Sequence, residues 1–513
     1  MCGIAGEWGW NGRPREQSAV AAMIGRLGHR GPEARACWLS SDGEIALAYT
    51  QLSFFEGART QPVSNARNSI FVVCNGEIYN HRELADLARQ SGVAPAMRSD
   101  IEIIPYLYEL RGTSSFSLLR GEFAFALYDS ENRLLYLVRD RIGVKPLYFH
   151  LAEGSILFAS EIKALFVHQG VSRNFDNASI ATKLFGITLS GRTAFSGIRE
   201  VKPGSYVKVA AGQIFEQSYW SPTFDGSGPA KPLAELAHEF REIFEEAVSI
   251  RLQGNYPIGA YLSGGIDSSA VLASMVRVGA TSLKAFTIQF EDQRFDESPE
   301  AINVASRLGV EHHLVPVRNR DLEQNFLQSI WHCEIPVINS HGTAKFLLSR
   351  AASQHVKGVM TGEGSDELFA GYPYFGRNTG GARSKHRSAK PRQLVAPVRI
   401  KPVDFRPSAD GTCKRCHPPH SLVRLRTLSR SEKPVLCSFD STAAQSGISA
   451  LLLTVGCAGI HGAGTATGQD YSDDGYKRRS PPRLEKRPTG LYSELLGGSG
   501  GNGAFDRRPC SLP

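Results

Sequence analysis

A cysteine stands at position 2, directly after the initiator methionine. Cysteine is small enough for that methionine to be removed, and the mature chain would then carry a thiol and a free α-amine on one residue. The pKa of an α-amine is about 8, so the amine can act as an internal general base for its own thiol. A cysteine at this position is usually incidental, so a catalytic interpretation of Cys2 needs support from other residues.

A second run that could do chemistry is SGGIDSS at residues 263–269. It follows an apolar strand expected at 258–262 and opens a helix expected at about 267–278. Two consecutive glycines expose backbone N–H groups, and a helix start adds partial positive charge, so the run can hold an anion such as a phosphate. It lacks the lysine of a Walker loop. The simpler alternative is a tight strand-to-helix turn capped by serines.

The elements that position Cys2 are expected to be mainly strands. Up to about residue 215, short apolar or alternating runs are separated by turn-forming Asn, Gly and Asp, which favours β-structure. We expect layered sheets with flanking helices. The strands include 70–74, 123–128 and 134–138, and the helices include 81–89 and 101–110.

The glycine- and serine-rich run belongs to a different kind of fold. A polar, Gly- and Pro-containing stretch at 215–232 indicates a linker, and beyond it strands and helices alternate, which predicts a parallel, doubly wound sheet. The amphipathic helix 233–252 comes first, followed by strands 258–262, 285–289 and 313–317 with helices at 267–278 and 298–307 between them.

The first half carries several motifs in a fixed order. CGIAG begins at Cys2, HRGP at His29, NGEIYN at Asn75, SD at Ser99 and RDRIGVKPLY at Arg139. Over residues 1 to about 210 this set resembles the glutaminase domain of class II, N-terminal-nucleophile glutamine amidotransferases, particularly that of asparagine synthetases. Taken alone, NGEIYN would fit a hairpin turn, and the aspartate of SD a helix N-cap.

The resemblance implies roles for individual residues. Cys2 would attack the side-chain amide of glutamine, giving a glutamyl thioester and ammonia. The Asn75 side chain and the Gly76 backbone N–H would stabilise the oxygen of the tetrahedral intermediate. Asp100 would hold the α-ammonium group of glutamine, and Glu77 would help to bind the amino acid.

One position departs from the family pattern. Gln51, Leu52 and Ser53 correspond to a motif that usually begins with arginine, which pairs with the glutamine carboxylate. Glutamine cannot form a charge-assisted bidentate pair, so we expect weaker substrate binding unless Arg30 or Arg59 compensates.

The run at 263–269 and a second motif, VMTGEGSDELF at 359–369, resemble the synthetase domain of asparagine synthetases, which belongs to the ATP pyrophosphatases. Such enzymes cleave ATP to AMP and pyrophosphate and need Mg²⁺ with oxygen ligands. Glu363 would lie at the reacting centre, and Asp296 and Glu297 are further matches. The resemblance assigns ATP binding to Leu262, Ser263, Gly264, Gly265, Asp267, Ser268, Ser269, Ile288, Thr361 and Gly362, and metal binding to Asp267 and Asp366.

The charge of the chain divides near residue 375. The whole chain has 58 Lys+Arg and 50 Asp+Glu, a net charge of +8, but residues 376–513 contain 23 and 10 of these, which leaves 35 and 40 for 1–375. The basicity therefore argues for neither nucleic acid nor a membrane surface as partner. The tail has no family motif, and we interpret it as frameshifted or disordered. Its Cys413, Cys416, His417 and His420 have zinc-like spacing without a second half, and Lys477–Arg479 is a short solvated basic run.

The sequence thus predicts an α+β glutaminase domain at 2–214, a linker at 215–232 and an incomplete α/β parallel-sheet ATP-pyrophosphatase domain at 233–375, followed by the tail at 376–513. The expected activity is ATP-dependent amidation of the aspartate side chain by ammonia from glutamine, in the cytoplasm, with a homodimer possible. Alternatives are another carboxylate acceptor (a sugar acid, a cell-surface component or a cyclising β-amino acid), a glutaminase with an inactive synthetase half, or a basic-tailed binding protein.

Overall fold

The computed structural model describes residues 2–372, apart from 54–59, 94, 96, 224–230, 255 and 338, and two strands farther along the chain. These two strands, β17 (Ser421–Arg424) and β18 (Leu436–Phe439), pair antiparallel within a separate unit that spans Arg377–Arg478. The zinc-like residues at 413–420 and the basic run at 477–479 lie outside the described residues.

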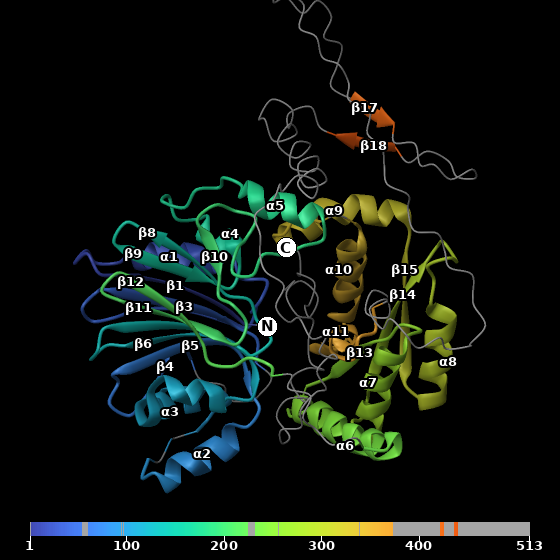
Figure 1. The fold of residues 1–513 in the computed structure, drawn as a ribbon, viewed down its shortest axis with the longest axis horizontal. Coiled ribbons are helices and arrows are strands. Elements are labelled where there is room, and N and C mark those ends of the chain that lie inside the picture. Colours follow the sequence, from blue (N-terminus) through green and yellow to red (C-terminus); the bar gives the residue numbers. More distant parts are fainter. Residues whose placement is uncertain are drawn as a thin grey trace, which may run out of the picture. The chain divides into compact units, whose positions relative to one another are not determined.

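The first half of the chain contains two six-stranded antiparallel sheets, as the sequence predicts (Figure 1). The first sheet has the order β10-β8-β9-β1-β3-β2, with β1 between β3 and β9. Residue 2 therefore immediately precedes a central strand. The strands are β1 (Gly3–Gly9), β2 (Ala34–Leu39), β3 (Ile45–Gln51), β8 (Tyr148–Ala152), β9 (Ser155–Ala159) and β10 (Ile198–Glu200).

The second sheet has the order β12-β11-β7-β6-β5-β4 and carries the NGEIYN motif. That motif forms no hairpin turn, because residues 75–78 continue β5 and pair with β6 from Asn75–Ala124 to Ile78–Gly121. The strands are β4 (Val63–Ser64), β5 (Ile70–Ile78), β6 (Gly121–Asp129), β7 (Leu134–Arg139), β11 (Ser205–Ala210) and β12 (Gln213–Ser218). Because β12 pairs with β11 as far as Ser218, the start of the expected linker at 215–218 belongs to the sheet.

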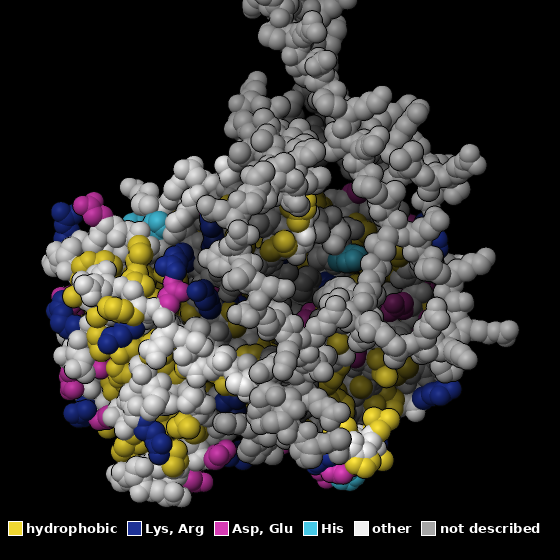
Figure 2. Space-filling model, in the orientation of Figure 1, with side chains coloured by type: hydrophobic (Ala, Val, Ile, Leu, Met, Phe, Trp, Pro, Cys, Tyr) yellow, Lys and Arg dark blue, Asp and Glu magenta, His cyan; other side chains and the backbone are white. Residues whose placement is uncertain are grey.

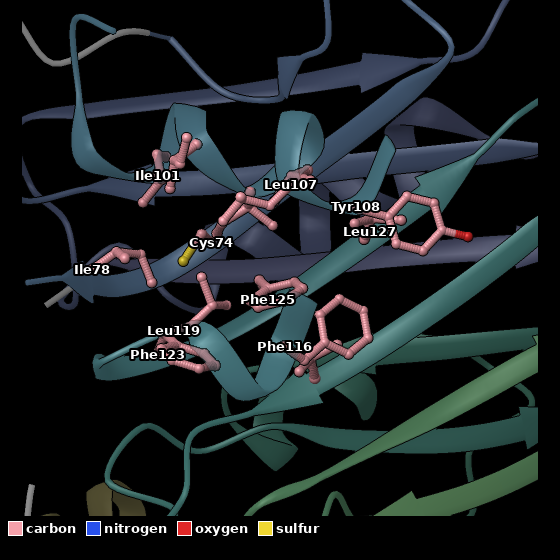
Figure 3. Packing of buried hydrophobic residues seen from close by; sticks show 14 of the residues in the cluster. Cys74, Ile78, Ile101, Leu107, Tyr108, Phe116, Leu119, Phe123, Phe125 and Leu127 are labelled. Carbon is pink, nitrogen blue, oxygen red and sulfur yellow. The ribbon is translucent and has the colours of Figure 1, made fainter. Parts of the chain in front are cut away.

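Three apolar layers hold the two sheets and their helices together. One cluster lies between the sheets, and the others lie under helices on the two outer faces. Figure 3 shows the layer beneath α3, where Leu107 and Phe116 pack over Phe125 and Cys74 of the second sheet. The helices of this half are α1 (Gln17–Gly25), α2 (His81–Gln90), η1 (Asp100–Glu102), α3 (Ile103–Arg111), η2 (Gly112–Leu118), α4 (Ile162–Leu165) and α5 (Asn177–Leu184).

The second half contains a four-stranded parallel sheet of order β15-β14-β13-β16, as the alternating pattern predicts. Apolar residues of α6, α7 and α8 pack on one face and those of α10 on the other. The strands are β13 (Ile258–Tyr261), β14 (Lys284–Phe290), β15 (Glu311–Val317) and β16 (Gly358–Met360). The helices are α6 (Leu233–Arg251), α7 (Ile266–Arg277), α8 (Ser298–Leu308), α9 (Asn319–Cys333), α10 (His341–Ala352) and α11 (Ser365–Phe369).

Two further observations concern the length of the helices and the charge of the surface. No helix among the described residues is long and apolar enough to span a bilayer. On the face seen in Figure 2, Lys and Arg side chains are interspersed with Asp and Glu.

Candidate active site

The first sheet fixes the backbone beside Cys2. The Gly3 N–H donates to Thr50 Oγ1 of β3 at 3.0 Å, and the Ile4 N–H donates to Ser160 Oγ, next to β9, at 3.0 Å. The thiol therefore projects from a backbone that is tied to strands on both sides.

The Cys2 thiol is partly buried and contacts the end of β3. The Leu52 N–H donates to Cys2 Sγ at 3.4 Å, and the thiol lies 3.7 Å from the Leu52 carbonyl oxygen. Burial raises the pKa of the Cys2 thiol, while the Leu52 N–H and the Arg30 charge lower it. Because a thiolate is a stronger nucleophile than a thiol, the Leu52 N–H is a group that can affect the reactivity of Cys2.

Asn75 is the clearest sign of a site on the second sheet. Its side chain is completely buried on β5, and neither Nδ2 nor Oδ1 has a hydrogen-bond partner among the residues that the structure describes. Leaving a buried amide unpaired costs about 1–3 kcal/mol, so native folds rarely do so without a functional reason. Asn75 can therefore donate to an oxygen of a bound molecule.

Gly76 is a position that only glycine fits. Its φ is 149°, and a Cβ there would lie 2.0 Å from the Glu122 carbonyl oxygen on β6. The absence of a side chain lets β5 and β6 approach closely, and it leaves the backbone next to Asn75 accessible to a substrate.

Two carboxyl groups lie beyond Gly76, of which Glu77 is half-buried and Asp100 is buried. Asp100 accepts a hydrogen bond from the Ile78 N–H at 2.6 Å. Burial and the neighbouring Asp100 carboxylate hold the pKa of Glu77 well above its ordinary range, and burial likewise raises the pKa of Asp100. Two carboxyl groups in this state favour a cation between them, which fits the α-ammonium group of an amino acid.

Gln51 and Arg30 differ in their availability to a substrate carboxylate. The Gln51 side chain donates to Ser53 Oγ at 2.7 Å. Arg30 donates to the Cys2 carbonyl at 2.9 Å and pairs with Glu161 at 2.7 Å, both deep in the protein. Its charge is thus already balanced by a carboxylate. Arg59, the other expected substitute, lies outside the described residues.

A buried ion network that the sequence motifs do not reveal continues from Glu161. Lys163 Nζ lies 2.5 Å from Glu161 and 2.9 Å from Glu334, which directly follows α9. The Glu334 carboxylate also accepts the backbone N–H groups of Ile162 and Lys163 at 2.6 and 2.7 Å. Burial opposes ionisation of Glu161, but Lys163 and Arg30 hold its pKa well below the ordinary range. In the sequence, the only sign of this network was that its charged residues stand singly among apolar ones.

The run at 263–269 forms a loop between β13 and α7. Ser268 Oγ accepts the Ser263 N–H at 3.0 Å, and Ser263 Oγ accepts the Gly265 N–H at 3.1 Å, which closes the loop on itself. The Gly264 N–H points to Glu297 at 3.3 Å. The hydroxyl contacts agree with the turn-and-cap alternative, and the exposed helix start is also what an anion site requires.

The second predicted motif lies against the same helix start. A Cβ on Gly362 would lie 2.8 Å from the Ser268 nitrogen and 2.9 Å from the Asp267 carbonyl carbon, so only glycine allows this approach. Leu262 and Thr361 are buried, and Ile288 is half-buried beside them in the sheet. The Ser269 hydroxyl donates back to the Gly265 carbonyl at 2.7 Å.

Acidic residues gather at this end of the sheet. Burial and the neighbouring Asp366 carboxylate raise the pKa of Asp267. Two carboxylates that repel each other suit a hard cation such as Mg²⁺ when phosphate oxygens complete its shell. No cluster of three or more His, Cys, Asp or Glu side chains able to hold a metal alone occurs in the described part of the chain.

Glu363 forms an ion pair with Lys345 of α10. Burial lowers the pKa of Lys345 to about 8. The sequence motifs do not single out Lys345, which adds a positive charge at the expected reacting centre.

Comparisons with known proteins agree with this division of the chain. Residues 1–220 match the glutamine amidotransferase domain family, and residues 239–430 match the asparagine synthase family. The two parts of the chain are thus similar to two families, one after the other. The asparagine synthase match runs past residue 375, where the recognisable motifs end. We call the two parts the amidotransferase domain and the synthase domain.

Curated relatives carry two different names. The amidase chyE of Penicillium rubens is 38% identical over 371 residues, which cover 68% of this chain and 54% of the relative. The amidase chry2 of Gibberella zeae is 35% identical over 374 residues, with the same coverage. A glutamine-hydrolysing asparagine synthetase of Bacillus subtilis is 30% identical over 383 residues, covering 72% of this chain and 59% of the relative. The chain thus spans little more than half the length of these relatives.

Proposed function

We propose that the chain is a glutamine-dependent amidotransferase in which the synthase domain activates a carboxylate with ATP and ammonia from glutamine converts it to an amide. The observation that carries this proposal is the completely buried, unpartnered Asn75 amide on the strand that also supplies Gly76 and Glu77. A glutamine thioester intermediate needs such a donor for its oxygen.

In the amidotransferase domain, each candidate residue has a separate role in glutamine hydrolysis. The Cys2 sulfur attacks the glutamine amide carbon, and the Cys2 amine takes up the thiol proton and returns it to the departing ammonia. Asn75 Nδ2 and the Gly76 N–H donate to the developing oxyanion. Glu77 and Asp100 hold the substrate α-ammonium group. Leu52 and Ser53 border the thiol, and Gln51 faces the substrate carboxylate only through neutral hydrogen bonds.

The synthase residues would hold ATP at the sheet edge. The start of α7, within the 263–269 run, would face the polyphosphate, while Leu262, Ile288, Thr361 and Gly362 would frame the nucleotide. Asp267 and Asp366 would hold Mg²⁺, which when bound neutralises the polyphosphate. Glu363 faces the activated carboxyl group. We assign the protein to the cytoplasm.

Our first candidate acceptor is the β-carboxylate of aspartate. A different carboxylate is the second candidate, because two relatives of higher identity are named amidases and not asparagine synthetases. Pyrophosphate release with Mg²⁺-ATP, measured with aspartate and then with other carboxylic acids, decides between them. Release that requires aspartate supports the first candidate, release with another acid supports the second, and no release with any acid contradicts the synthase half of the proposal.

The role of Cys2 has its own test. In Cys2→Ala, glutamine hydrolysis should fall on the order of 10³-fold or more, because the nucleophile is lost. Pyrophosphate release with ammonium salts in place of glutamine should persist. Equal rates of glutamine hydrolysis in wild type and Cys2→Ala would remove Cys2 as the nucleophile.

A further inference from the structure

Lys357 lies at the start of the strand that carries the synthase motif. It directly precedes β16, and the chain continues from β16 into Thr361, Gly362 and Glu363. Its side chain nevertheless contacts the amidotransferase domain: Nζ donates to the Ser53 carbonyl at 3.0 Å and pairs with Glu33 at 2.7 Å.

The contact with Ser53 lies one residue from Leu52, whose N–H donates to the Cys2 thiol. Glu33 also accepts the Ser53 N–H at 2.8 Å, so Lys357, Ser53 and Glu33 form a closed ring. The ring holds the backbone on both sides of the Ser53 α-carbon. The preceding residue, Leu52, is buried and donates its N–H to Cys2 Sγ.

The Lys357 side chain is itself well fixed. Its Nζ lies 3.7 Å from the centre of the Tyr256 ring, and its backbone N–H donates to the Pro257 carbonyl at 2.8 Å, next to β13. The side chains of Lys357 and Glu33 are 23% and 35% exposed, and ion pairs at such partly solvated positions contribute little to stability. What this contact supplies is a fixed position.

We propose that Lys357 is a positioning residue through which the synthase domain sets the Leu52 N–H against the Cys2 thiol, and so couples glutamine hydrolysis to the state of the β16 edge. The inference rests on the proposed function. A bound acyl-adenylate contacts the residues that follow β16, and a displacement of that strand reaches Ser53 through one side chain. Because coupling between binding sites is reciprocal, glutamine bound near Cys2 also affects the affinity of the synthase edge for its ligands.

A second route between the domains is longer. Glu334 is linked to the Cys2 carbonyl through Lys163, Glu161 and Arg30 in succession. A further buried pair, Arg251 with Glu122 at 2.9 Å, joins α6 to β6 of the second sheet. Lys357 is separated from the Leu52 N–H by a single peptide unit, so the larger effect on Cys2 is expected from Lys357.

The test compares Lys357→Met with Lys284→Met in the full chain. Lys284 is a matched control because it begins the neighbouring strand β14 and also pairs with a glutamate, Glu311, but within the synthase domain.

Two quantities are measured: KM and kcat for glutamine hydrolysis, with and without Mg²⁺-ATP and aspartate, and the pH dependence of Cys2 alkylation by iodoacetamide. In Lys357→Met we expect about a tenfold rise in glutamine KM, alkylation shifted to higher pH and loss of any response to ATP and aspartate. Lys284→Met should match wild type.

Unchanged KM and an unchanged alkylation profile in Lys357→Met would overturn the inference, as would equal changes in Lys284→Met. Lys357→Arg should restore much of the wild-type profile, which a general packing defect would not allow. If Lys357→Met does not fold, Glu33→Gln tests the same ring from the other domain, with the same expected shift. Absence of ATP cleavage in wild type would contradict the proposed function, whereas the alkylation profile still decides the role of Lys357.

Discussion

The two domains present their chemistry in different ways. In the amidotransferase domain the candidate residues sit on central strands, where register and packing fix them: Asn75 and Gly76 lie inside β5, and Cys2 immediately precedes β1. In the synthase domain they lie on loops at the edge of a parallel sheet, and Ile266 is 81% exposed at the first position of α7. The fold thus fixes the candidate residues of the first site more firmly than those of the second.

The difference also appears in the electrostatics. The amidotransferase site contains one buried ion pair, Arg30 with Glu161, and one neutral amide, Asn75, without a partner among the described residues. In the synthase site, burial and the nearby Asp366 carboxylate raise the pKa of Asp267. An oxyanion that exists briefly needs fixed dipoles, whereas a polyphosphate with its metal ion brings the neutralising charge with it. For both sites we expect mutation to reduce activity without reducing stability, for a different physical reason in each domain.

After Cys2→Ala, the largest effect is expected at Asn75. In Asn75→Ala the kcat for glutamine hydrolysis should fall about 10²- to 10³-fold, the usual loss of one oxyanion donor. The melting temperature should not fall appreciably, because the buried amide makes no hydrogen bond in the resting protein. Steady-state kinetics and thermal unfolding measure the two quantities. A large loss of stability with little loss of kcat would show that Asn75 is a structural residue.

A smaller loss is expected at Asp267. Asp267→Asn should lower ATP-dependent pyrophosphate release about 10²-fold, because a metal ligand that stabilises developing charge is worth several kcal/mol. Removing one of two repelling carboxylates should leave the unfolding free energy unchanged or raise it. Glutamine hydrolysis measured without ATP serves as the control and should keep its wild-type rate. Pyrophosphate release at the wild-type rate would exclude Asp267 from metal binding.

The smallest effect is expected at Gln51. Gln51→Arg should lower the glutamine KM about tenfold, because a charged pair replaces a neutral hydrogen bond to the substrate carboxylate. The value of kcat should change little, since the contact is made equally in the ground and transition states. An unchanged KM would show that another cation already fills this role.

Sequence patterns predicted most of the elements around the two sites. The alternation around 70–74 and 123–128 gave the paired strands β5 and β6, and the strand–helix rhythm after 233 gave the parallel sheet. The spacing of apolar and polar residues could not show that NGEIYN continues a strand, because Asn and Gly usually favour turns. It also assigned Phe215 to a linker, although this residue pairs with Lys208 in the sheet.

Contacts that join distant segments, two of them between the domains, lay beyond any sequence pattern. Lys357, Glu334 and Lys345 occur singly, in segments whose spacing suggests only a strand or a helix. Their partners are Glu33, Lys163 and Glu363, and two of these three pairs join residues more than 150 positions apart. Motif spacing identifies residues that act on a substrate. Residues that position other residues become visible only when the fold brings them together.

The proposed function requires that ammonia released from glutamine in the amidotransferase domain is used in the synthase domain. The most direct test supplies glutamine labelled with ¹⁵N in its side-chain amide, together with Mg²⁺-ATP and aspartate or the acid that supports pyrophosphate release. We predict one labelled amide formed per AMP in wild type and no labelled amide in Cys2→Ala, which should still use unlabelled ammonium. Labelled glutamine hydrolysed without any labelled amide product, or labelled amide formed by Cys2→Ala, would contradict the account.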